Sequence, residues 1–299
     1  MAEETMSLLS RQKPVFRFAP SPNGRLHLGH ALSAILNHDM AQAKGGRLLL
    51  RIEDIDLARC TREFEQGIYE DLAWLGLTWE TPVRRQSEHF DWYRAALEKL
   101  VEMGLVYPSF MSRSDVKTFV NSCEANGEMW PRDPDGAPLY PPLDKLKSAQ
   151  EVAALLSSTS TKHAWRLDMD KAMARLRQPL SWTETGSGLN AVTIADPAVW
   201  GDVILSRSDA ASSYHLSVVV DDALQDVSHV VRGMDLFHAT SVHRLLQELL
   251  GLPVPEYHHH RLVLDGDGRK LSKNIGSPSL NALRDDGVSP SDVRSLLGI

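Results

Sequence analysis

The sequence contains few cysteines and no long apolar run. Cys60 and Cys123 are the only cysteines in 299 residues, too few for a disulfide framework or a four-cysteine zinc site. No stretch approaches the ~20 apolar residues of a membrane span, and residues 1–14 carry charged side chains where a signal peptide would be apolar. We therefore expect a soluble cytoplasmic protein from a reducing compartment, with no membrane partner.

The sequence also has no excess of positive charge. Its net charge of −7 gives no sign of nucleic acid binding, but a local basic groove can contact phosphates while the net charge averages it away. Hydrophobic residues make up 42% and charged residues 24% of the chain, as in ordinary globular proteins. The composition therefore indicates a folded protein with a sizeable core and leaves its partners open.

Strand and helix patterns alternate over the first part of the chain. Residues 15–19 are β-rich, prolines and a glycine interrupt 20–24, and residues 27–44 repeat apolar side chains at helical spacing. Residues 47–53 form a second apolar strand. Strand, loop, helix and strand in this order are the βαβ unit of a parallel sheet, so the sequence predicts an α/β fold.

The same patterns predict further elements. Amphipathic helices are expected at 62–75 and 90–103, each followed by a glycine where a C-terminal cap belongs. Strand patterns return at 202–206, 217–220 and 227–231.

The intervening segment differs in character. Prolines crowd residues 131–142, and Ser148 to Glu151 form a capping box that opens a short helix. We interpret 105–195 as an inserted α+β module. We expect a core domain in two halves, 15–104 and 196–275, separated by the insert at 105–195. Residues 1–14 and 276–299 are expected to be tails. A short helix is expected at about 291–297 in the last of these.

The first chemical motif lies at residues 20–30, where a strand gives way to a helix. Such a junction presents unpaired backbone N–H groups and the positive end of the helix dipole to a phosphate. Gly24 and Gly29 let a ligand approach the backbone closely. His27 and His30 share the first turn, where they could donate hydrogen bonds to charge on an α-phosphate. Two histidines that only cap a surface helix are the alternative, which the surrounding residues disfavour.

The second motif is Lys270-Leu-Ser-Lys273, which follows a turn-rich loop at 265–268. Two lysines in such a loop could close over a triphosphate and neutralise the departing pyrophosphate. A solvated surface loop is the simpler interpretation of this tetrapeptide alone. Paired with the motif at 20–30, it indicates ATP chemistry.

The two motifs together resemble the signature of class I aminoacyl-tRNA synthetases. Four further segments resemble the glutamyl branch: 17–24, 50–54, 219–222 and 230–233. The resemblance implies a Rossmann-like catalytic core, interrupted by the insert and lacking an anticodon-binding domain. Because the sequence ends 26 residues after Lys273, it is similar to short paralogs of glutamyl-tRNA synthetase, which attach glutamate to queuosine in the anticodon of tRNA(Asp).

The resemblance also implies roles for individual residues. The catalytic residues would be His27, His30, Lys270 and Lys273. ATP, with Mg²⁺ on its phosphates, would be bound by Pro20, Gly24, His27, Gly29, His30 and Lys273. Glutamate would be bound by Arg17, Phe18, Ala19, Pro20, Ser21, Glu53, Tyr214 and Arg232. Glu53 would pair with the α-ammonium, and the guanidinium of Arg232 would contact a carboxylate.

Each of these residues also has a structural interpretation. Glu53 could be an ion-pair partner at a strand end, Tyr214 a core tyrosine and Arg232 a surface strand residue. Asp221 and Asp222 could be taken for a magnesium site, although magnesium is expected on the ATP phosphates.

Two groups of residues bear on metal binding. Relatives carry Cys-x-Cys and Tyr-x-x-x-Cys in the insert, but here Ser109, Met111 and Asp144 replace the cysteines around Tyr140. Serine and methionine are poor zinc ligands, so we expect no structural zinc and suppose that packing of 131–142 holds the insert. The run His258–His260 is interpreted as a strand, in which three successive side chains cannot converge on one ion.

Three functions follow from these observations. The first is ATP-dependent activation of glutamate and its transfer to queuosine in tRNA(Asp). The second is a compact glutamyl-tRNA synthetase that charges the tRNA 3′ end. The third is a non-catalytic synthetase-like module that binds tRNA or glutamate. The expected partners are L-glutamate, ATP and queuosine-containing tRNA(Asp), and nothing in the sequence demands more than a monomer.

Overall fold

The computed structural model describes residues 13–186, 191–208, 210–264 and 278–299. Seven strands form one sheet in the order β3-β2-β1-β9-β10-β6-β7, parallel except for β7. Their bounds are β1 Val15–Phe18, β2 Arg47–Ile52, β3 Glu80–Arg85, β6 Ser181–Glu184, β7 Ala191–Ile194, β9 His229–Gly233 and β10 Glu256–His260. The central pair, β1 and β9, joins the two halves of the chain, so the predicted α/β Rossmann-like core is confirmed.

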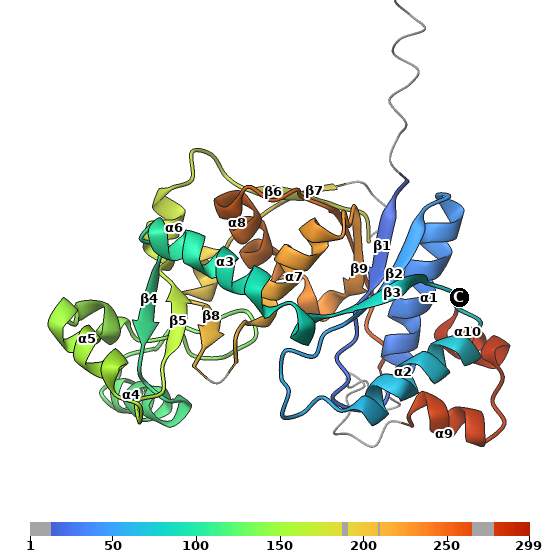
Figure 1. Cartoon of the computed structure of the whole chain (residues 1–299), viewed down its shortest axis with the longest axis horizontal. Helices are drawn as coiled ribbons and strands as arrows, with labels where there is room; N and C mark the ends of the chain where they lie inside the picture. The colour runs from blue at the N-terminus through green and yellow to red at the C-terminus, as the bar shows by residue number, and fades with distance from the viewer. Residues whose placement is uncertain (1–12, 187–190, 209, 265–277) are drawn as a thin grey trace, which may run out of the picture.

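Helices cover both faces of this sheet (Figure 1). On one face, α1 (Leu28–Ala43) packs on β1, β2 and β9, with α2 (Arg62–Trp74) beside it. The other face carries α7 (Tyr214–Leu224) and α8 (Thr240–Leu250), against which α3 (Phe90–Glu102) packs. The helices predicted at 27–44, 62–75 and 90–103 are confirmed by α1, α2 and α3.

A smaller antiparallel sheet has the order β4-β5-β8. Its strands are β4 (Val106–Ser109), β5 (Ala164–Leu167) and β8 (Ile204–Arg207), and its neighbours in the sequence are α4 (Arg113–Ala125), α5 (Ala149–Ser157) and α6 (Met169–Ala174). The capping box predicted from Ser148 is present at the start of α5. Short 3₁₀ helices complete the chain: η2 Gln86–Glu88, η3 Pro142–Leu146, η4 Ala198–Trp200 and η5 Met234–Leu236.

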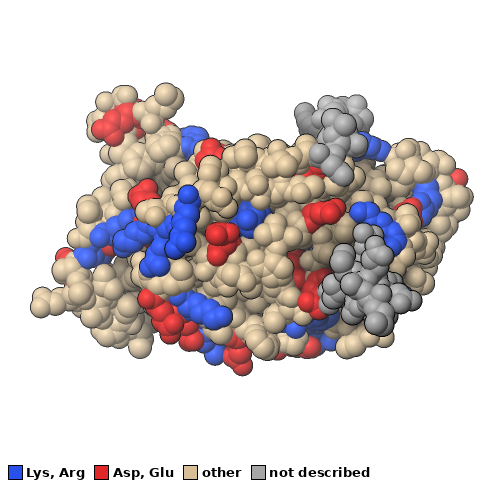
Figure 2. All heavy atoms as spheres, turned by 90° about the horizontal axis from the view of Figure 1, so that it is seen from above, with Lys and Arg blue, Asp and Glu red and all other residues tan. Residues whose placement is uncertain are grey.

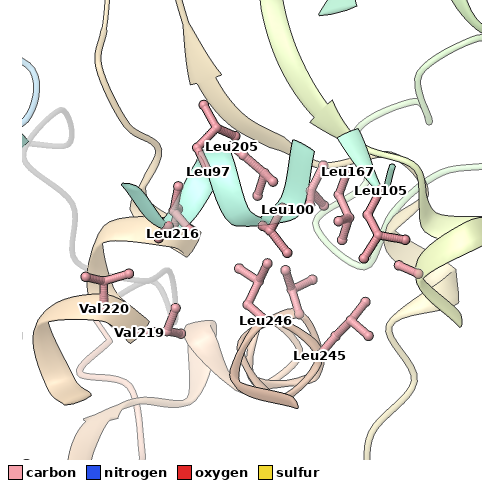
Figure 3. Close-up of a cluster of buried hydrophobic side chains, with 14 of the residues drawn as sticks. Leu97, Leu100, Leu105, Leu167, Leu205, Leu216, Val219, Val220, Leu245 and Leu246 are labelled. Carbon is pink, nitrogen blue, oxygen red and sulfur yellow. The ribbon is translucent and has the colours of Figure 1, made fainter. Parts of the chain in front are cut away.

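One apolar cluster connects the two sheets (Figure 3). Leucines of α3, α7 and α8 meet leucines of β5 and β8: Leu97, Leu100, Leu216, Leu245, Leu246, Leu167 and Leu205. Burial of such side chains contributes roughly 1.5–3 kcal/mol each. The cluster therefore fixes the small sheet against the helices that support the large one.

The sheets do not divide the chain at the expected boundaries. β6 and β7 lie within the expected insert, 105–195, yet they extend the large sheet beside β10. β8 lies within the expected second half of the core, yet it pairs with β5 in the small sheet. A strand pattern does not specify a distant pairing partner, so the sequence does not predict in which sheet these three strands pair. The division of the chain into these parts stays a prediction.

The strand predicted at 217–220 is wrong, because these residues belong to α7. The side chain of Ser213 caps this helix by accepting from the backbone N–H of Leu216 at 3.4 Å. Every residue from Leu216 to Asp222 is buried, so contacts surround the helix on all sides. Tertiary packing here overrides the β preference of three consecutive valines.

The C-terminal tail forms two helices, α9 (Leu280–Asp285) and α10 (Pro290–Leu297), of which only the second was predicted. Leu280, Val293 and Leu297 are buried in the cluster beneath α1, and the backbone N–H of Leu280 donates to the carbonyl of Leu26 at 2.8 Å. Most of the expected tail at 1–14 lies outside the described residues, as do Lys270 and Lys273.

The surface in Figure 2 carries Lys and Arg side chains close to Asp and Glu side chains, with no broad field of one sign. This mixture agrees with the modest net charge of −7. Within the described ranges, no helix has the length and apolar character needed to cross a bilayer.

Candidate active site

A cavity of about 380 Å³ opens where β1, β9 and β10 reach their carboxyl ends. In open α/β sheets this edge is the usual ligand site. Many of the predicted ATP-binding and glutamate-binding residues line this cavity: Arg17, Phe18, Ala19, Pro20, Ser21, His27, Gly29, His30, Glu53, Tyr214 and Arg232. Gly24 does not line it, and Lys270 and Lys273 lie outside the described residues.

The motif at 20–30 is a loop that ends in the N-cap, His27, and the first turn of α1. The Nδ1 of His27 accepts from the backbone N–H of Gly29 at 3.1 Å, and the Nδ1 of His30 accepts from the backbone N–H of His27 at 3.2 Å. An accepting Nδ1 leaves the proton of a neutral imidazole on Nε2. Both rings, whose centroids are 3.9 Å apart, can therefore donate through Nε2 while they cap the helix.

Gly29 has a structural role in addition to the expected ligand approach. A Cβ at this position would lie 3.0 Å from Cε1 of the His27 ring. Glycine therefore keeps the His27 imidazole in its capping position.

Arg17 is held in the cavity wall by a buried carboxylate. Its Nε donates to Oδ1 of Asp222 at 3.1 Å, and Nη1 of Arg51 donates to the same oxygen at 2.7 Å. The neighbouring Asp221 accepts from Nε of Arg84 at 2.7 Å. Both acids are committed to arginines, which excludes the magnesium interpretation of Asp221 and Asp222.

Glu53 lies between this arginine cluster and the cavity. Its Oε1 accepts from Nη2 of Arg51 at 3.1 Å, so the ion-pair interpretation of Glu53 is correct, and Glu53 also lines the cavity. Burial raises the pKa of its carboxyl above the usual range, and the charges of Arg51 and Arg17 oppose this shift only in part. A ligand cation beside Glu53 would favour the ionised carboxylate.

Arg232 is buried, so the surface interpretation of this residue is wrong. Its Nη1 donates to the hydroxyl of Tyr214 at 3.3 Å and lies 3.1 Å from Nδ1 of His243. Its Nη2 donates to Oγ1 of Thr240 at 2.6 Å. Burial raises the pKa of the Tyr214 hydroxyl and, together with the charge of Arg232, lowers that of His243 well below its usual value.

A histidine connects Arg232 to a distant carboxylate. Nε of Arg232 donates to Nε2 of His259 at 3.1 Å, and Nδ1 of His259 lies 2.5 Å from Oε2 of Glu184. Burial disfavours the Glu184 carboxylate, but the hydrogen bonds from the His259 ring and backbone outweigh it and lower its pKa to about 2. Among the described residues, no carboxylate forms a direct ion pair with Arg232, and its N–H groups are hydrogen-bonded to uncharged oxygens and to imidazole nitrogens, including the carbonyl of Leu236 at 3.1 Å. A ligand carboxylate would therefore interact with the charge of Arg232 rather than with an unused N–H group.

No pattern in the sequence points to Glu184, His243 or Thr240 as site residues. Only His259 was foreseeable, as the member of the His258–His260 run that faces the opposite side from its neighbours. His258 instead contacts Thr185, and His260 donates to the carbonyl of Arg261. The strand interpretation of this run is confirmed by β10. No three His, Cys, Asp or Glu side chains gather as a metal site in the described part of the chain.

Hydrogen bonds connect residues at positions where the resemblance implied zinc ligands. The hydroxyl of Tyr140 donates to Asp144, and this carboxylate also accepts from the backbone N–H of Phe110 at 2.8 Å. Burial and Asp144 raise the pKa of Tyr140 to about 12. The guanidinium of Arg166 lies 3.7 Å from the Tyr140 ring centroid, and its Nε donates to Ser109 at 3.1 Å.

A second cavity, of about 560 Å³, lies next to the first. Ser21, Glu53 and Tyr214 line both cavities. The second cavity is also lined by Tyr140 and Arg166 from the network just described. The arrangement offers one site with two neighbouring chambers, which suits a ligand pair whose members meet at the shared wall.

Comparison with known proteins agrees with this geometry. Residues 15–298 match the family model described as tRNA synthetases class I (E and Q), catalytic domain. The chain is 47% identical over 289 residues to a glutamyl-Q tRNA(Asp) synthetase of Rhodobacter capsulatus, covering 95% of this chain and 100% of that protein. It is 36% identical over 294 residues to a glutamate–tRNA ligase of Prochlorococcus marinus, covering 94% of this chain and 58% of that protein.

A solved structure gives the same result. The crystal structure of a glutamate tRNA ligase from Elizabethkingia meningosepticum, in complex with its amino acid, matches with a TM-score of 0.72 and 27% identity, covering 90% of this chain and 54% of that one. The chain therefore spans little more than half the length of these glutamate–tRNA ligases. It belongs to the class I tRNA synthetase family for glutamate and glutamine, and it is a ligase of that class.

Proposed function

We propose that this chain activates L-glutamate with ATP and transfers the glutamyl group to queuosine in the anticodon of tRNA(Asp). The observation that carries the first half is the meeting of two sets of groups in one cavity. Imidazole donors lie at the N-terminus of α1, a position that favours phosphates, and two buried arginines, Arg17 and Arg232, line the same cavity. A nucleoside triphosphate matches the imidazole donors at the helix N-terminus. A dicarboxylic amino acid matches the two arginines.

In the first step, a carboxylate oxygen of glutamate attacks the α-phosphorus of ATP, and the bond to pyrophosphate breaks. Arg17 and Arg232 would orient the carboxylates, and Glu53 would receive the α-ammonium. His27 and His30 would donate through Nε2 to the charge that builds on the phosphate. Lys270 and Lys273 would neutralise the departing pyrophosphate, and Mg²⁺ carried on ATP would reduce the charge of the triphosphate.

In the second step, an acceptor hydroxyl attacks the acyl carbon of the adenylate, and AMP leaves. The acceptor would enter through the second cavity, because that cavity reaches the first at Ser21, Glu53 and Tyr214. Arg166 lines this route with its guanidinium fixed by Ser109 and the backbone carbonyl of Asp202, 2.6 Å from Nη1. Arginine suits the phosphates of an RNA backbone.

Queuosine as the acceptor is supported by sequence identity to a relative. This chain aligns with the whole length of the Rhodobacter capsulatus protein, whereas the same alignment reaches only 58% of the Prochlorococcus marinus ligase. The relative that is 47% identical to this chain carries the name glutamyl-Q tRNA(Asp) synthetase. A compact ligase for the tRNA 3′ end and a non-catalytic binding module are the competing functions.

Glutamate-dependent exchange of labelled pyrophosphate into ATP tests the activation step. We expect exchange without tRNA, with glutamate preferred over glutamine and aspartate. Absence of exchange, both without tRNA and with added tRNA, would favour the binding module. The acceptor requires a separate charging assay, because exchange reports only the adenylate.

A further inference from the structure

His260 is a buried residue of the first cavity that the proposed reaction does not use. It ends β10, is 7% exposed and lines the cavity. Its Nδ1 lies 2.8 Å from the carbonyl oxygen of Arg261. A carbonyl can only accept, so Nδ1 carries the proton.

The other ring nitrogen of His260 is an acceptor that lacks a donor. Burial lowers the pKa of this imidazole below its usual value, so the ring is neutral and Nε2 presents a lone pair. Nε2 is buried, and no group in the described ranges forms a hydrogen bond with it. Buried polar atoms are nearly always paired, so this nitrogen points to a hydrogen-bond donor on a ligand.

The position of His260 in the sheet indicates which part of a ligand this side chain would contact. His259 pairs in register with Arg232, and His260 pairs with Gly233. Neighbouring strand residues in register share a face, so His259 and Arg232 face the α7 and α8 side, where the carboxylate groups lie. His260 and Gly233 face the α1 side, which carries the imidazoles of the phosphate site.

The immediate surroundings suit a flat ring. Leu262 and Val263 line the cavity close to His260 in sequence, and Gly233 contributes no side chain there. A Cβ on Gly233 would lie 2.3 Å from Oδ1 of Asp235, so a larger residue here would displace the Asp235 side chain. Asp235 and Arg261 also line the cavity here, but the apolar side chains of Leu262 and Val263 beside a buried acceptor suit the flat face and the amino group of a heterocyclic base.

We propose that Nε2 of His260 accepts a hydrogen bond from the exocyclic amine of adenine and so helps the site to select ATP. The inference rests on the proposed function, because it assumes that this cavity holds ATP. A base with a carbonyl oxygen at that position, as in guanine, would place two acceptors against each other.

Nucleotide preference in the exchange assay tests this proposal. We compare ATP with purine riboside triphosphate, which lacks the exocyclic amine, in the wild-type chain, His260→Leu and His260→Gln. The wild-type should prefer ATP by about tenfold in kcat/KM, the effect of one hydrogen bond to a buried acceptor. His260→Leu should bring the ratio close to one, and His260→Gln, whose amide oxygen also accepts, should retain a preference.

His258→Leu is the matched control, because His258 lies on the same strand but does not line the cavity. It should keep the wild-type ratio. If a variant loses exchange, the same ratio is measured from nucleotide dissociation constants by calorimetry.

An unchanged ratio in His260→Leu would overturn the proposal. So would a selective loss of discrimination between ATP and 2′-deoxy-ATP, since the donor would then be a ribose hydroxyl. Failure of the proposed function looks different, because the wild-type chain would then show no glutamate-dependent exchange with any nucleotide.

Discussion

Nε of Arg17 donates to Oδ1 of Asp222 across 3.1 Å, and this one oxygen also accepts from the fully buried Arg51. A single carboxylate therefore orients a cavity arginine and neutralises a core arginine. The pair connects β1 to α7, elements separated by most of the chain.

Replacing Asp222→Asn should weaken both folding and substrate binding. The free energy of unfolding should fall by about 3 kcal/mol or more, because two buried guanidinium groups lose their shared anion. The KM for glutamate should rise about tenfold as Arg17 loses its orientation. Urea unfolding and pyrophosphate exchange measure the two effects. Glu63→Gln, which removes an exposed ion pair with Arg25, should cost less than about 1 kcal/mol; equal losses in both variants would contradict the account.

His27→Asn should separate the two roles of His27. Asparagine is a good N-cap, so the free energy of unfolding should change by less than about 1 kcal/mol. The Nε2 donor is lost, and the rate of exchange should fall about 100-fold or more. Retained exchange with an intact helix would limit His27 to capping.

Asp71 should give the stability a pH dependence. Both of its carboxylate oxygens are buried and lack hydrogen bonds within the described chain, and Nη1 of Arg284 lies 3.7 Å from Oδ1. Burial raises the pKa of Asp71 to about 6. Because the folded protein holds this proton more tightly than the unfolded chain, the contribution of Asp71 is greatest below pH 4 and is lost as the pH rises through 6.

Asp71→Asn should therefore stabilise the protein more at pH 7.5 than at pH 4, by about 1–3 kcal/mol. Urea unfolding at a series of pH values measures the difference. Glu70→Gln, an exposed neighbour on α2, gives the baseline for removing one carboxylate from this helix. A variant-minus-wild-type difference that does not rise with pH would show that Asp71 is not the titrating group.

The hydrogen-bonded network of Tyr140 and Asp144 should make zinc unnecessary. We predict that the purified chain holds far less than one zinc per molecule by elemental analysis. The backbone N–H of Met111 donates to the Tyr140 hydroxyl at 3.1 Å, and Arg166 connects Ser109 to Tyr140. Ser109→Cys, Met111→Cys and Asp144→Cys together, with Tyr140 unchanged, should therefore create a four-ligand site that binds zinc. Stoichiometric zinc in the wild-type chain would contradict this prediction.

The local parts of the structure could be predicted from the sequence. The strand, turn and helix around His27 follow from apolar spacing and glycines within about 40 residues. The capping box at Ser148 can be recognised from four consecutive residues. These features depend on neighbours in the chain, which is why β1, α1 and α5 begin where expected.

The remaining parts depend on distant partners. The relay from Glu184 through His259 to Arg232 brings together residues 75 and 27 positions apart, and no spacing rule relates them. The pairing of β6 with β10 and the helical state of Val218–Val220 are set by tertiary packing. The sequence could therefore nominate Arg232 as a ligand contact but not the histidine and carboxylate that support it.

Transfer of labelled glutamate to tRNA tests the central claim most directly. The assay uses tRNA(Asp) prepared from cells with and without queuosine, followed by nuclease digestion that separates the anticodon loop from the 3′ end. We predict label only on queuosine-containing tRNA and only in the anticodon fragment. Equal labelling of queuosine-free tRNA, or label at the 3′ end, would contradict the account.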